Sequence, residues 1–138
     1  MTPPRLPDWR PRLTAYLAET AHQGFRYGSN DCALFAAGAV RAMTGQDPAA
    51  AWRGTYTTLE GGLERLRKAG FKDHIDQAGT LFAAVAPAFA QVGDIAGIET
   101  PAGWALGIFT GECIACLTPA GLGHLPRGAA SLAWTVPL

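Results

Sequence analysis

The spacing of apolar residues changes once along the chain, close to Gly93, and this change limits the possible folds more than any other feature. Before Gly93, apolar residues recur at intervals of three and four, which is typical of amphipathic helices. After it, short apolar runs are separated by Gly, Pro and Glu at hairpin intervals, which is typical of antiparallel strands. Helices followed by strands predict an α+β domain with the two kinds of element in separate layers.

Local signals give the expected bounds of these elements. Three helices are expected: one after an N-cap at Asp8 and before Gly24, one over residues 32–44, and one over residues 59–70. The second is rich in alanine and carries an apolar stripe, so we expect it to be the central buried helix. The expected strands cover residues 94–99, 104–110, 113–118, 122–125 and 132–136.

Length and composition favour one folded domain over residues 1–138, with residues 1–8 as an extended N-terminal arm. Apolar residues make up 49% of the 138 residues and charged residues 16%, which is typical of a globular domain. Eleven basic and eleven acidic side chains balance, so binding to nucleic acid through a basic excess is not expected. The arm lacks an apolar stretch and no segment is long enough to span a bilayer, so we expect cytoplasmic synthesis, no signal peptide and no membrane partner.

Cys32 is the most informative single residue. It opens the expected central helix directly after two residues of N-cap type, Asn30 and Asp31. The positive end of a helix dipole favours a thiolate, so this position is expected to lower the pKa of the cysteine and suits a nucleophile. The alternative is that Cys32 is a small apolar residue of the core.

Three segments carry a resemblance to a known family. Residues 27–35 (YGSNDCALF), 92–95 (VGDI) and 106–111 (LGIFTG) resemble, in this order, the nucleophile segment and the first two core strands of NlpC-type papain-like cell-wall hydrolases. Residues 45–56, with their Trp52, Arg53 and Tyr56, resemble an uncharacterised branch of that superfamily encoded mainly by phages and prophages near tail genes. The resemblance implies a papain-like fold with Cys32 as the nucleophile position at the start of the central helix.

The sequence departs from this family at the general base. The family histidine aligns with Ala105, and the third polar residue falls around Ala115 and Cys116. A methyl group cannot accept the proton of a thiol, and the loss of a general base costs roughly a hundred- to ten-thousand-fold in rate. We therefore expect a papain-like domain that is inactive as a cysteine peptidase.

Three histidines and Asp94 are the other residues that could be considered as the missing general base. His124, within the strand region, is the candidate base, although an exposed or satisfied strand histidine is the alternative. His22 is expected at the surface near the end of the first helix, and His74 in a solvated polar loop. Asp94 is expected to be a turn residue that bonds to local backbone amides.

Cys113 and Cys116 form a CxxC pair, which suggests either half of a zinc site or a redox motif. Residues three apart on a strand point to opposite faces, so we expect no shared metal and no cofactor. The three cysteines of the chain do not suggest a disulfide framework. The four tryptophans are expected as core or interface anchors: Trp9, Trp52, Trp104 and Trp134.

The resemblance to the phage-encoded branch, together with the missing base, implies a structural component of a phage or prophage-type tail, in the tail-tip or hub region. Its expected partners are other tail proteins, and its expected location is the virion tail after synthesis in a bacterial host. The N-terminal arm and residues 134–138 are expected contact elements, beside an exposed apolar patch. The alternative is an active tail-associated cysteine peptidase or amidase that cuts cell-wall peptides with Cys32 as nucleophile.

Overall fold

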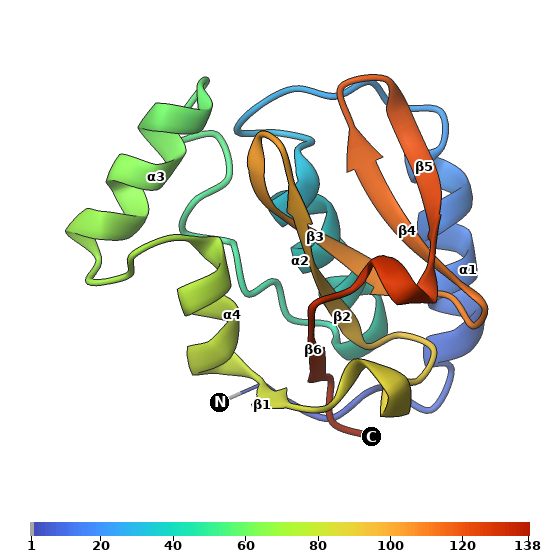
Figure 1. Cartoon of the computed structure of the whole chain (residues 1–138). Coiled ribbons are helices and arrows are strands. Elements are labelled where there is room, and N and C mark those ends of the chain that lie inside the picture. The colour runs from blue at the N-terminus through green and yellow to red at the C-terminus, as the bar shows by residue number, and fades with distance from the viewer. Residues whose placement is uncertain (1) are drawn as a thin grey trace.

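The computed structural model describes residues 2–138 and combines helices with one antiparallel sheet, which confirms the expected α+β class (Figure 1). Its helices are α1 (Trp9–Thr20), α2 (Cys32–Thr44), α3 (Leu59–Lys68) and α4 (His74–Leu81). Its strands are β1 (Ala83–Ala84), β2 (Ile95–Thr100), β3 (Gly103–Phe109), β4 (Cys113–Thr118), β5 (Gly121–Pro126) and β6 (Leu132–Thr135). Two short 3₁₀ turns complete it, η1 (Pro87–Phe89) and η2 (Arg127–Ala129). No helix in residues 2–138 has the length and apolar character needed to cross a membrane.

Helix α2 has the bounds expected from its local signals. The Asp31 side chain accepts a hydrogen bond from the Leu34 amide at 2.9 Å and caps the first turn. Gly45 ends the helix with φ of 85°, a left-handed conformation that glycine adopts without strain. The side chains of Phe35 and Met43 are fully buried, so α2 is the central helix of the core.

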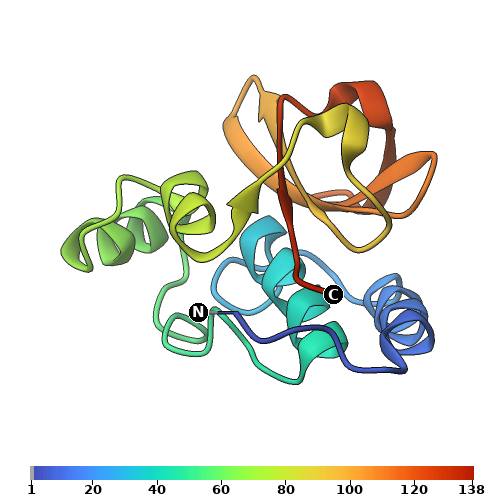
Figure 2. The same ribbon diagram turned by 90° about the horizontal axis from the view of Figure 1, so that it is seen from below.

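The six strands form one sheet in the order β1-β6-β2-β3-β4-β5, and the last strand of the chain therefore lies between β1 and β2. Helix α2 packs against β3 and β4, and α1 packs beside α2 (Figure 2). The cluster between helices and sheet includes Leu13, Phe35, Ile108 and Leu117. A smaller apolar cluster on the opposite face of the sheet includes Phe109.

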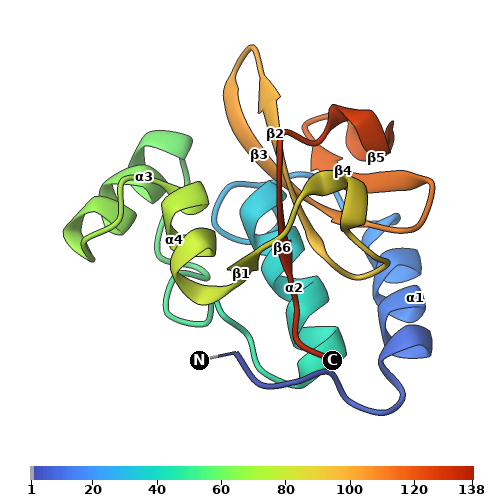
Figure 3. The ribbon, with the colours of Figure 1, turned by 60° about the horizontal axis from the view of Figure 1, so that its bottom comes forward.

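Helix α4 was not expected from the sequence, and the prediction of a solvated loop around His74 is wrong. Asp73 caps this helix by accepting from the Asp76 amide at 2.9 Å, and the Asp76 carboxylate in turn accepts from the Lys72 amide at 3.0 Å. Helices α3 and α4 lie side by side at one edge of the molecule, next to the sheet and α2 (Figure 3).

The N-terminal arm is extended as expected, but it packs against its own domain. Arg5 is buried and forms an ion pair with Asp94 at 2.8 Å, and its other guanidinium nitrogens donate to the carbonyls of Val92 and Val136. Asp94 also accepts from the Gln91 amide at 2.9 Å, so its expected role in the turn is confirmed.

The C-terminal segment, expected to be a contact element, is largely part of the core. Trp134 and Val136 are buried in the core, and only the last two residues, Pro137 and Leu138, are exposed. Residues near both ends of the described chain are thus buried against the rest of the domain.

Candidate functional site

A cleft of about 730 Å³ opens beside the first turn of α2. Its walls come from α2, from the α3–α4 pair, from the loop before α3 and from the cleft-facing parts of β2, β3 and β4. The lining is mainly apolar, with Trp52, Leu63 and Trp104 among its larger side chains, and it includes Cys32. The expected nucleophile position therefore borders a space large enough for a small ligand or a peptide segment.

Burial dominates the electrostatics of the Cys32 thiol. Removal from water raises the pKa of Cys32 above its ordinary value, and the nearby Asp31 carboxylate raises it further. The amide of Leu106 faces the sulfur and, with the amides of Cys32 and Ala33, opposes this shift without reversing it. The expected lowering of the pKa by the helix dipole is therefore wrong, because the desolvation of the sulfur outweighs it.

Asp31 is fully used in shaping the turn before α2. Besides capping Leu34, it accepts from the Gly28 amide at 3.1 Å and from the Tyr56 hydroxyl at 2.5 Å. Burial and these contacts with Asp31 raise the pKa of Tyr56 well above its usual range. A Cβ at Gly28 would lie 1.8 Å from the Tyr56 carbonyl oxygen, so only glycine fits at this close approach.

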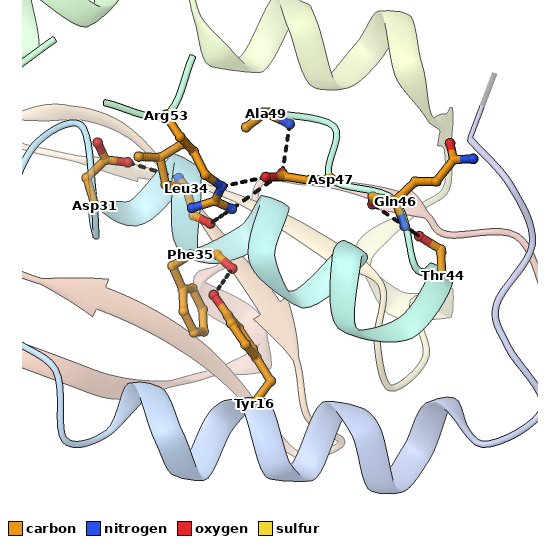
Figure 4. A network of polar contacts seen from close by, with 9 residues as sticks. All are labelled: Tyr16, Asp31, Leu34, Phe35, Thr44, Gln46, Asp47, Ala49 and Arg53. Carbon is orange, nitrogen blue, oxygen red and sulfur yellow. Dashed lines mark hydrogen bonds and ion pairs between the residues drawn. The ribbon is translucent and has the colours of Figure 1, made fainter. Parts of the chain in front are cut away.

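An ion pair holds the loop between α2 and α3 against the central helix. The Arg53 guanidinium bonds to Asp47 at 2.5 Å and to the Leu34 carbonyl at 3.1 Å (Figure 4). Asp47 also accepts from the Ala49 amide at 2.9 Å (Figure 4). These contacts fix the segment that carries Trp52 into the cleft wall, so residues of the 45–56 segment build the site.

The structure brings together the positions that the resemblance aligns with the catalytic residues. Ala105 on β3 lines the cleft together with Cys32 and Cys116. Cys116 on β4 lies with its sulfur 3.6 Å from the Leu106 carbonyl oxygen. Burial, with a smaller contribution from Cys32, raises the pKa of Cys116 to about 11. Ala115, the other candidate for the third position, lies in the core cluster between sheet and helices.

The histidines are distributed differently from the expectation. His124 on β5 is exposed, pairs with Ala115 and is not part of the cleft lining, so the structure does not bring it to Cys32. His22 is exposed beyond α1, as expected. His74 lines the cleft, where its Nε2 is 2.8 Å from the Trp104 carbonyl oxygen. Sequence reasoning missed His74, although the Asp73 cap pattern could have revealed its helix. Within residues 2–138, no hydrogen bond joins an imidazole to the Cys32 sulfur.

All three cysteines are free thiols. Cys116 is buried, while Cys113 is half-buried at the start of β4. Across residues 2–138, no three His, Cys, Asp or Glu side chains are grouped so that they could hold a metal ion.

The architecture and cleft define an α+β domain with a cysteine at the start of its central helix. Residues 4–136 match the model of a family described as a domain of unknown function, DUF6950, and the chain belongs to this family. No curated protein matches the sequence.

Proposed function

We propose that the chain is a structural component of a phage or prophage-type tail, in the tail-tip or hub region, and that it is built on an NlpC-like papain fold without peptidase activity. The resemblance of residues 27–35 and 45–56 supports the family and the tail setting. The order of the elements, with Cys32 opening the central helix and antiparallel strands following it, agrees with such a fold.

The observation that carries the non-catalytic part is the set of groups around Cys32. At the position of the family's base stands Ala105, whose methyl group cannot accept the proton of a thiol. The other groups near the sulfur are the Leu106 amide, Asp31, Tyr56 and Cys116. Asp31 is engaged in three hydrogen bonds, and the raised pKa of the thiol keeps the sulfur protonated near neutral pH.

Exposed apolar side chains support contacts with other proteins. Phe89 in η1 is 76% exposed and Leu138 is 79% exposed. Leu59 and Leu132 are the other large apolar side chains that are exposed among the described residues. Such side chains are suited to contacts that bury them in an assembly.

Purified particles from a host that carries the gene test the tail assignment. We expect the chain to co-sediment with tails and to appear in their mass spectra at a fixed ratio to the other tail proteins. Particles that carry Cys32→Ala are expected to assemble and infect as the wild type does. Complete tails that lack the chain would contradict the proposal.

An active cysteine hydrolase of cell-wall peptides is the second candidate. The open cleft beside Cys32 favours it, because His74 lies in the same lining and the amides at the start of α2 could stabilise an oxyanion. Cell-wall zymography with the wild type, Cys32→Ala and His74→Ala distinguishes the two. We expect no clearing by any of them; clearing by the wild type that Cys32→Ala abolishes would establish the hydrolase.

A further inference from the structure

Two of the three cysteines face the backbone of the same β3 residue, Leu106. The Cys116 thiol lies 3.6 Å from the Leu106 carbonyl oxygen, and the Leu106 amide faces the Cys32 sulfur. The N–H and C=O of one residue in a strand point to the same side, so both sulfurs approach β3 from the side of β4. Both residues also line the cleft. The two sulfurs therefore face the N–H and the C=O of one residue from the same side, in the same region of the cleft wall.

The gap that holds these sulfurs results from a short strand pairing. Strands β3 and β4 pair only at Ile108 with Ala115 and at Phe109 with Ile114. Continuing this register would place Leu106 opposite Leu117, but the ladder stops before that point. The N–H and the C=O of Leu106 thus face sulfur atoms where a regular sheet would offer them the backbone of β4.

The two thiols differ in access. Cys32 is half-buried at the wall of the open cleft, so we expect a small reagent that enters the cleft to reach it. Cys116 is only 4% exposed, so its accessible partner is the neighbouring sulfur rather than a reagent in solution. An accessible thiol beside a shielded one is the arrangement in which one cysteine reacts first and the second resolves the adduct.

We propose that Cys32 and Cys116 are a redox pair that closes to an intramolecular disulfide when the protein meets a small-molecule disulfide such as oxidised glutathione. The Cys32 thiolate attacks one sulfur of the reagent, forms a mixed disulfide and releases one glutathione thiolate. The Cys116 thiolate then attacks the Cys32 sulfur and displaces the second glutathione. The two cysteines lose two electrons and two protons, and the reagent is reduced to two thiols.

The bond would join the start of α2 to β4 across the site. Thiols stay reduced in the bacterial cytoplasm and are oxidised outside the cell. If the chain is a tail component, which rests on the proposed function, the bond forms after release of the particle and locks the first turn of the central helix. The disulfide itself does not depend on that function.

Intact-mass measurement of the folded wild-type chain tests the proposal directly. After incubation with oxidised glutathione at about pH 8.5, near the pKa of a free thiol, we expect a chain lighter by two hydrogen atoms. Alkylatable thiols should fall from three to one, and a peptide map should show Cys32 joined to Cys116. Dithiothreitol should restore all three.

Two variants locate the reaction. Cys116→Ala is expected to stop at a stable glutathione adduct on Cys32, whereas Cys113→Ala, the matched control, should close as the wild type does. A lasting glutathione adduct on wild-type Cys32, a disulfide that involves Cys113, or three unchanged thiols would overturn the proposal. The wild-type result is decisive even if Cys116→Ala fails to fold. A wild-type chain that closes its disulfide but is absent from tails would contradict only the tail assignment.

Discussion

The two ends of helix α2 have opposite surroundings. At its C-terminal end, the Met43 carbonyl accepts from the Leu6 amide at 2.7 Å, and the Ala42 carbonyl accepts from the Arg12 guanidinium at 2.6 Å. The buried pair of Arg5 and Asp94 completes this end. At its N-terminal end, Cys32 borders a large cleft.

The two ends of α2 therefore have different roles: the C-terminal end contributes mainly to stability, and the N-terminal end carries the reactive thiol. At the C-terminal end, charges and last-turn carbonyls are paired by the N-terminal arm and by Arg12 of α1, so this end fixes the arrangement of helices, sheet and chain ends. At the N-terminal end, hydrogen bonds to Asp31 hold the turn while thiols line an open space. We therefore expect substitutions at the first end to cost more unfolding free energy than substitutions at the second, where the reactivity of the thiols is also open to change.

The largest effect is expected for Asp94→Ala. It leaves the buried Arg5 charge without its partner and removes the acceptor of the Gln91 and Val136 amides. Breaking a buried pair from one side costs about 3–5 kcal/mol of unfolding free energy, which urea denaturation measures. The control is Asp47→Ala, whose partner Arg53 is more exposed, with an expected loss of about 1 kcal/mol. Equal losses of unfolding free energy in the two variants would show that the buried pair at the C-terminal end of α2 is no more important for stability than the pair of Arg53 and Asp47.

A smaller effect is expected for Tyr56→Phe. The change removes the hydroxyl that donates to the buried Asp31 carboxylate, and a hydrogen bond to a charged group contributes about 1.5–3 kcal/mol. Tyr27→Phe is the matched control because the edge-to-face contact of its ring with Phe25 is retained. If both variants unfold at the same urea concentration as the wild type, Tyr56 does not support the turn.

His74→Ala is expected to cost less again. It removes one hydrogen bond to the Trp104 carbonyl, which corresponds to about 0.5–1.5 kcal/mol in thermal or urea unfolding. His22→Ala, at an exposed position, should leave stability unchanged. A stability loss as large as that of Asp94→Ala would mean that α4 is as essential to the core as the arm.

The smallest effect concerns Cys32 and pH. Because burial raises the pKa of its thiol, the rate of iodoacetamide alkylation should reach half of its maximum above the free-cysteine value of about 8.5. The folded chain holds this proton more tightly than the unfolded chain, so the unfolding free energy should fall as the pH rises beyond that value. Subtracting the rate of Cys32→Ala removes the reaction of other thiols. A midpoint below about 8.5 would show that the helix dipole prevails after all.

The sequence predicted those elements whose signals are local. The bounds of α2 follow from Asp31 and Gly45, and β4 was expected over the residues that form it, because cap and turn residues act on their own neighbours. Helix α4 was missed because its short polar start resembles a loop, although Asp73 is a cap. The N-terminal arm was correctly expected to be extended, but its packing against the domain was not, because its main partner, Asp94, lies far away in the sequence.

The site was predictable only in part for the same reason. A motif placed Cys32 at the helix start and Ala105 at the position of the base, but a motif carries no information on burial. The helix dipole was therefore overestimated, because desolvation depends on how β3 and the cleft walls surround the sulfur. The approach of Cys116 and Cys32 to the backbone of Leu106 depends on the early end of the β3–β4 ladder, which no sequence pattern indicates.

The backbone contact between the two ends of the chain has an engineering consequence. The Arg5 amide donates to the Pro137 carbonyl at 2.9 Å, so the first and last segments run side by side. A short flexible linker could join them, and new termini could open at the exposed Gly70 between α3 and α4. Such a circular permutant would keep the buried ion pair on a continuous backbone and would place α3 and α4 at opposite ends of the new chain.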